Sequence, residues 1–130
     1  MRTLEAVEAR DGACLSLRWS DGTKAEITLP VKKAGPVELG EWGHSVVWPD
    51  GTELGADTLW LATLTVIGRD DARRFLEWRM ANGLSLTKAA EALGLARRTV
   101  AYYSNGDRPV PKTVLLACKG WDATHRHKAA

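Results

Sequence analysis

The chain has 130 residues, of which 45% are hydrophobic and 26% charged. This composition is typical of a folded globular protein and excludes a fibrous or largely disordered chain, and the length suits one ordinary domain or two small ones. No apolar run approaches the roughly 18 residues of a membrane span, and acidic residues lie in MRTLEAVEAR, where a signal peptide would be apolar, so we expect a cytoplasmic protein.

The formal net charge of +2 is divided unevenly along the chain. Residues 1–68 hold six basic residues against ten acidic ones, a net charge of −4, and residues 69–130 hold twelve against six, a net charge of +6. A basic half favours contact with nucleic acid and an acidic half disfavours it. We therefore expect any DNA contact to lie in the C-terminal half.

Residues 3–29 alternate between apolar and polar side chains with a period of two. Asp-Gly pairs interrupt the alternation at positions 11–12 and 21–22, which predicts three strands joined by tight hairpins. Cys14 or Leu15 is expected on the same face as Leu17.

Residues 30–43 contain too many prolines and glycines for a helix and predict a loop, with room for a short edge strand at 37–39. A further strand is expected at 45–48 and a short helical segment at 56–66. Together these elements predict a small, mostly antiparallel α+β domain over residues 1–67. Large side chains are needed to fill such a core, so we expect packing, rather than a ligand cage, from the tryptophans Trp19, Trp42, Trp48 and Trp60.

The C-terminal half has the periodicity of helices. Residues 69–80 predict one helix, capped by Asp70 or Asp71, with Phe75 and Leu76 facing inward. A last helix is expected from Pro111 to Cys118, closed by Gly120. Residues 68–122 then form the second domain, and residues 123–130 are expected to be a flexible tail.

Between these helices, residues 84–111 read L-S-L-T-K-A-A-E-A-L-G-L-A-R-R-T-V-A-Y-Y-S-N-G-D-R-P-V-P. Ser85 caps a first short helix, small residues Ala89 and Ala90 allow a close crossing, Gly94 makes the turn, and a second helix begins near Arg97. Val100 and Tyr103 face inward on that second helix, which leaves a positively charged outer face.

The combined spacing of Leu84-Ser85, Ala90, Leu93-Gly94, Thr99-Val100 and Asn105-Gly106 resembles the helix-turn-helix of the lambda-repressor-like (Cro and xenobiotic-response-element type) DNA-binding family. The resemblance covers residues 69–121 and implies an all-α DNA-binding domain. This sequence departs from the family at two positions. Leu86 replaces the usual glutamine, and Ala96 replaces the usual serine or threonine cap.

The resemblance also implies roles for individual side chains. The positions that face base edges in the major groove are Arg97, Arg98, Ala101 and Tyr102. The positions near the phosphate backbone are Thr99 and Asn105, with Arg73, Arg74, Arg108 and Lys112 as further neighbours of the phosphates.

A second resemblance lies upstream. The run V-V-W-P-D-G-T-E-L-G-A-D-T-L-W at residues 46–60 is similar to a small α+β domain of unknown function that precedes helix-turn-helix modules of this type. It implies no activity.

No spacing in the chain resembles a nucleophile elbow, a phosphate loop or a zinc-protease motif, so we expect neither catalysis nor a cofactor. Cys14 and Cys118 lie far apart and are interpreted as small hydrophobic residues. His125 and His127 lack a third ligand and do not predict a metal site.

These patterns predict a two-domain regulator that binds double-stranded DNA. One helix reads only a few base pairs, so we expect a homodimer on two half-sites, most simply a transcriptional repressor. The alternative is an antitoxin or adaptor whose N-terminal domain binds a protein partner, and a third hypothesis is a small-ligand sensor. Two regions are candidates for holding the dimer: an edge of the N-terminal sheet and the surroundings of Trp121.

Overall fold

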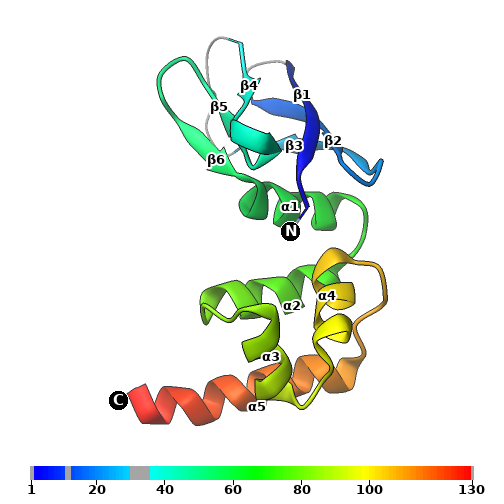
Figure 1. Cartoon of the computed structure of the whole chain (residues 1–130), viewed down its shortest axis with the longest axis vertical. Helices are drawn as coiled ribbons and strands as arrows, with labels where there is room; N and C mark the ends of the chain where they lie inside the picture. The colour runs from blue at the N-terminus through cyan, green and yellow to red at the C-terminus, as the bar shows by residue number, and fades with distance from the viewer. Residues whose placement is uncertain (1, 11–12, 30–35, 130) are drawn as a thin grey trace. The chain divides into compact units, whose positions relative to one another are not determined.

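The computed structural model describes residues 2–10, 13–29 and 36–129, with side chains as far as His125. The chain divides into two compact units, Met1–Gly68 and Arg69–Ala130 (Figure 1). The N-terminal unit holds antiparallel sheets and one α-helix, and the C-terminal unit holds four α-helices among the described residues. The chain is therefore an α+β protein, as the sequence predicts.

The first sheet consists of β1 (Leu4–Arg10), β2 (Cys14–Trp19) and β3 (Lys24–Thr28), paired antiparallel in that order. The three predicted strands are confirmed, although the first Asp-Gly pair lies outside the described residues. Leu15 lies opposite Ile27, and both side chains are buried. Because side chains alternate between faces, Leu15 and not Cys14 faces the core.

The second sheet has the order β4 (Glu38–Leu39), β5 (Ser45–Val47) and β6 (Glu53–Gly55). A 3₁₀ turn, η1 (Glu41–Gly43), joins the first two strands. The edge strand and the strand at 45–48 are confirmed, whereas β6 was not predicted. Residues 30–35 of the expected loop lie outside the described part of the chain.

Helix α1 (Ala56–Val66) confirms the helical segment expected at 56–66. Its Thr63 hydroxyl accepts a 3.0 Å hydrogen bond from the indole nitrogen of Trp19, and the ring of Trp60 meets the ring of Trp19 edge-on at 5.0 Å. Trp48 is also buried, so three of the four predicted core tryptophans are confirmed.

The prediction for Trp42 is wrong, because this side chain is 81% exposed. The turn η1 packs through its glycine instead. Gly43 is buried, and a Cβ atom built there would lie 2.3 Å from the carbonyl oxygen of Leu4. The tryptophan beside it is left in solvent.

The C-terminal unit contains α2 (Asp70–Ala81), α3 (Leu86–Leu93), α4 (Arg97–Asn105) and α5 (Lys112–Ala129). All four helices contribute to its core or pack against it. The core is formed by Phe75, Trp78, Ala89, Ala90, Val100, Tyr103, Val110 and Cys118. Phe75 and Tyr103 meet edge-on with ring centroids 5.5 Å apart, which joins α2 to α4.

The expected end of the last helix is wrong. Helix α5 continues through Gly120 to Ala129, so residues 123–129 are helical. Interior glycine costs a helix only about 1 kcal/mol, and tertiary contacts compensate for it here. The Asp122 carboxylate accepts hydrogen bonds from the Trp78 indole at 3.0 Å and the Asn82 amide at 3.1 Å.

No helix in the part of the chain that the structure describes has both the length and the apolar character needed to cross a membrane.

Candidate nucleic-acid interface

The site is built on two short helices and the three residues between them. The Ser85 hydroxyl accepts a 3.1 Å hydrogen bond from the Lys88 amide and starts α3, as expected. Gly94 ends α3 in the left-handed conformation (φ 70°), which glycine adopts without a steric penalty. The Leu95 amide then donates to the carbonyl of Ala90 at 2.9 Å, and the chain enters α4 two residues later.

Small side chains let α3 and α4 approach each other. Ala89 is fully buried and Ala90 is 6% exposed, and Val100 on α4 is also fully buried. These residues pack in one cluster with Phe75 of α2. The inner faces of both helices are thereby occupied, and the outer face of α4 is fixed in space.

The outer face of α4 begins with two arginines. Arg97 and Arg98 are both exposed, and neither forms an ion pair with a residue that the structure describes. Ala96 at the N-cap has extended backbone angles but provides no side-chain cap, so this helix start depends on packing. Ala101 and Thr99 are half-buried.

Tyr102 is also half-buried, and its ring is covered on one face. The guanidinium carbon of Arg108 lies 4.3 Å from the centroid of that ring, which is the geometry of a cation–π contact. The sequence predicted a contact with bases for Tyr102 and a contact with phosphates for Arg108. In the structure these two side chains contact each other.

The turn after α4 is held by two residues at the start of α2. The Arg69 guanidinium donates to the carbonyl oxygens of Gly106 and, at 3.1 Å, Arg108. It also donates to the Asp71 carboxylate at 3.3 Å, and this carboxylate accepts a 2.7 Å hydrogen bond from the Val110 amide. We call this pair, Arg69 and Asp71, the clamp.

The sequence missed the clamp. It predicted Asp70 or Asp71 as the cap of α2, but the N-cap residue is Arg69 and has no side-chain cap bond. Burial alone would raise the pKa of Asp71, but the hydrogen bonds from Val110 and Arg69 outweigh burial and hold this pKa below its ordinary value.

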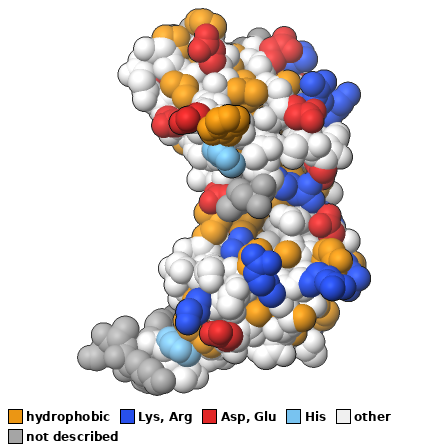
Figure 2. All heavy atoms as spheres, viewed as in Figure 1, with side chains coloured by type: hydrophobic (Ala, Val, Ile, Leu, Met, Phe, Trp, Pro, Cys, Tyr) orange, Lys and Arg blue, Asp and Glu red, His pale blue; other side chains and the backbone are white. Residues whose placement is uncertain are grey.

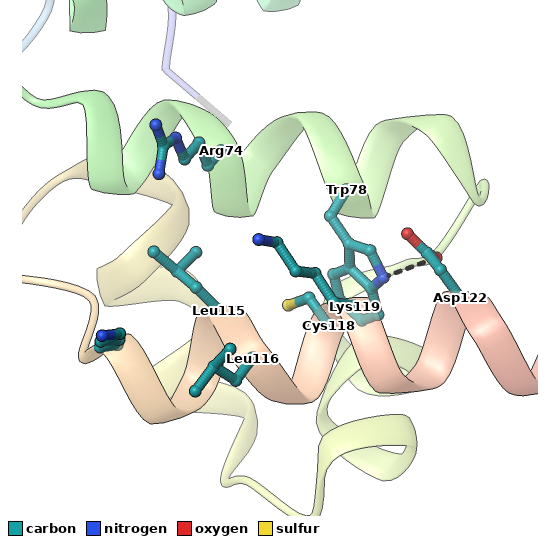
Figure 3. Close-up of a pocket in the computed structure, with 8 residues that line it drawn as sticks. Arg74, Trp78, Leu115, Leu116, Cys118, Lys119 and Asp122 are labelled. Carbon is teal, nitrogen blue, oxygen red and sulfur yellow. Dashed lines mark hydrogen bonds between the residues drawn. The ribbon is translucent and has the colours of Figure 1, made fainter.

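The other predicted phosphate contacts fall into different places. Asn105 is the last residue of α4 and is half-buried. Arg73 on α2 donates to Glu77 at 2.7 Å. Arg74 and Lys112 line a groove of about 300 Å³ between α2 and α5 (Figure 3). Arg97 and Arg98 of α4 are not among the residues that line this groove.

Charge is distributed over the surface as the sequence predicts. On the face seen in Figure 2, basic side chains predominate over acidic ones in the C-terminal unit, drawn in the lower part. Among the described residues, no three His, Cys, Asp or Glu side chains come together in a group that could hold a metal ion.

A solved structure is similar to almost the whole of this chain. No family model and no curated protein matches the chain. The crystal structure of the candidate DNA-binding protein NE0471 from Nitrosomonas europaea superposes with a TM-score of 0.64 and is 37% identical. The match covers 96% of this chain and 89% of that one. The chain thus belongs to the family of NE0471.

Proposed function

We propose that the chain binds double-stranded DNA through its C-terminal unit, as a lambda-repressor-like helix-turn-helix domain with α4 as the recognition helix. The observation that carries the proposal is the arrangement of α4, whose inner face is packed against α2 and α3 while Arg97 and Arg98 project from its first turn. A DNA-binding function is also given for the relative NE0471, as a candidate function.

In the proposed complex, Arg97 and Arg98 donate to the O6 and N7 atoms of guanine in the major groove. This bidentate contact is the commonest specific contact to DNA. Ala101 and Tyr102 lie one turn further along the same helix and meet the neighbouring base, with the methyl group of thymine as the apolar partner.

The phosphate contacts are assigned to α4 and to the turn that follows it. Thr99, Asn105 and Arg108 provide hydroxyl, amide and guanidinium donors for the backbone oxygens. Because the clamp holds the carbonyls of Gly106 and Arg108, it fixes the turn on which Arg108 is presented. Arg74 and Lys112 line the groove between α2 and α5, and we assign them no phosphate contact.

At the level of the molecule, we propose a cytoplasmic transcriptional repressor that acts as a homodimer on two half-sites. One recognition helix contacts too few base pairs for specificity in a genome, and two copies one helical turn apart double the site. The proposal assigns no catalytic step to either unit.

The proposal is tested by titrating a labelled mixed-sequence duplex with the purified protein at several salt concentrations. We expect the logarithm of the association constant to fall linearly with the logarithm of the salt concentration. Arg108→Ala should reduce the magnitude of that slope by about 0.9, the loss of one phosphate contact. Lys24→Ala, which removes one charge from the N-terminal unit, is the matched control and should leave the slope unchanged. A wild-type protein that binds no duplex at low salt would refute the proposal.

A further inference from the structure

Trp42 is the most exposed large hydrophobic side chain among the described residues, at 81%. Tryptophan combines a large apolar ring with a polar N–H group, and this residue type is enriched at protein interfaces. Its indole nitrogen donates to the carboxylate of Glu41 at 3.2 Å. The side chain is thus held in solvent with an acidic group beside it.

The backbone that presents Trp42 is strained. Its φ of 59° makes it the one described non-glycine residue with a positive φ, and such a conformation costs about 1–2 kcal/mol for a residue with a Cβ atom. The neighbouring Gly43 is packed so closely on Leu4 that no side chain fits there. Strain that a tight environment maintains is typical of functional positions, so we treat the turn as a preorganised feature.

Exposed acidic side chains lie on this turn and on the two outer strands of the same sheet. Glu41 is exposed, and Glu38 on β4 is exposed as well. The carboxylate of Glu53 accepts a 2.5 Å hydrogen bond from Ser45 and would lie 3.3 Å from a Cβ atom on Gly40, directly before η1. In Figure 2, hydrophobic and acidic side chains lie side by side on this unit. We call Trp42 with these three glutamates the acidic knob.

The groove between α2 and α5 has the complementary chemistry. Its apolar lining comes from Trp78, Leu115, Leu116 and Cys118, and Leu116 is 53% exposed with no described side chain covering it (Figure 3). Its basic residues are Arg74, Lys112 and Lys119, none of which forms an ion pair with a described residue. The remaining carboxylate, Asp122, is already engaged by Trp78 and Asn82.

We propose that the acidic knob of one copy of the chain docks in this groove of a second copy. The indole of Trp42 fills the apolar part, about 300 Å³, and the glutamates pair with the lysines and the arginine on its rim. A buried aromatic anchor inside a ring of charged contacts is the usual anatomy of an energetic hot spot. The opposite net charges of the two halves of the sequence steer the copies together.

Each copy carries one knob and one groove, so two copies can form the contact twice. Two such contacts double the buried area, which brings a small contact nearer to the roughly 1,000 Å² that a specific interface requires. This contact specifies the dimer of the proposed function. Its test below contains no DNA, so its failure would leave DNA binding standing.

The first measurement is the molar mass of the full-length protein by light scattering and sedimentation over a wide concentration range. We expect a reversible monomer–dimer equilibrium. Trp42→Gly and Lys119→Glu should each weaken the dimer at least tenfold, because one removes the anchor and the other reverses a rim charge. Trp42→Gly keeps the turn, since glycine adopts the positive φ freely. Circular dichroism verifies that each variant is folded.

Two control variants isolate the surfaces. Val66→Ala removes another exposed hydrophobic side chain of the N-terminal unit, 52% exposed, and Lys88→Glu reverses an exposed lysine of the C-terminal unit outside the groove. Both should associate like the wild type.

Mixing the variants tests whether the knob of one copy docks in the groove of another. A mixed dimer of Trp42→Gly and Lys119→Glu retains one intact contact, the wild-type knob of the second variant in the wild-type groove of the first. The mixture should therefore associate more strongly than either variant alone. A protein that stays monomeric at all concentrations, a dimer indifferent to Trp42→Gly, or a mixture no stronger than its components would each overturn the proposal.

Discussion

At the scale of single residues, Arg97 and Arg98 determine which sequence is bound in the proposed complex. Replacing either with alanine removes one bidentate contact, worth about 1–3 kcal/mol of discrimination between bases. We expect each variant to lose preference at one base-pair position in a competition assay with single-position duplex variants, while its affinity for unrelated duplexes falls much less. Lys24→Ala again provides the control. An unchanged preference in both arginine variants would mean that another element reads the bases.

Trp42 gives a second prediction at this scale, on stability. Its ring is 81% exposed and contributes little packing, whereas its backbone has a φ of 59°. At concentrations where the protein is monomeric, Trp42→Gly should therefore raise the free energy of unfolding by about 0.5–1 kcal/mol, the left-handed penalty less the greater chain entropy of glycine. Chemical denaturation measures the change. Glu41→Gly, at the neighbouring position, has a negative φ and should destabilise the protein, and the opposite order of the two variants would contradict the argument.

At the scale of elements, two glycines of the C-terminal unit should respond in opposite ways to alanine. Gly120 lies inside α5, and a Cβ atom there would meet nothing within 4 Å. Gly120→Ala should stabilise the unit by about 0.5–1 kcal/mol. Gly94→Ala has the same open space but a φ of +70°, so it should destabilise by about 1 kcal/mol. Thermal unfolding of both variants shows whether the backbone conformation, rather than the space around the glycine, determines if alanine stabilises or destabilises the unit.

The clamp between α2 and the turn after α4 predicts a pH dependence. Hydrogen bonds from Val110 and Arg69 hold the pKa of Asp71 below its ordinary value despite burial. A carboxyl group with a depressed pKa stabilises the folded state at any pH above its ordinary pKa, about 3.9. This contribution to stability is lost as the pH falls below about 3.9 and through the depressed pKa. Asp71→Asn should cost about 1–2 kcal/mol at pH 7 and much less at pH 3.

Denaturation at both pH values measures the effect of the clamp. The exposed Asp70 occupies the same first turn of α2, so Asp70→Asn is the matched control and should change stability by only a few tenths of a kcal/mol. An equal loss for Asp71→Asn at both pH values would show that its charge is unimportant.

The elements also show what the sequence could predict. The hairpin at Asp21-Gly22, the Ser85 cap and the turn at Gly94 depend on neighbouring residues, and these features are confirmed. Strand β6 has the sequence Glu-Leu-Gly and only one apolar side chain, too few to show a pattern. The extension of α5 depends on the Trp78–Asp122 hydrogen bond, whose partners lie 44 residues apart.

In the candidate site, too, features that depend on neighbouring residues were predictable and features that depend on distant residues were not. The outward direction of Arg97 and Arg98 follows from the period of one helix and was predictable. The clamp joins residues that are 37 to 39 positions apart, and the pairing of Tyr102 with Arg108 depends on the path of a turn. Neither follows from local spacing, because both depend on how α2 and α4 pack.

At the scale of the whole molecule, the two units carry net charges of opposite sign and are suited to different binding partners. The C-terminal unit, with a net charge of +6 in its sequence, is suited to a polyanion, and the acidic N-terminal unit is suited to a basic protein surface. With the proposed reciprocal contact, a second copy supplies that surface, and dimerisation and DNA binding use different faces of the same four helices.

The proposed function requires that two copies of the chain together recognise a particular DNA sequence. This requirement is tested by selecting bound duplexes from a random pool with the purified wild-type protein at near-physiological salt, followed by sequencing. We expect a two-fold symmetric motif with half-sites about one helical turn, roughly 10 base pairs, apart. Salt-sensitive binding without any enriched sequence would contradict it and would favour the alternative of an antitoxin or adaptor that acts through a protein partner.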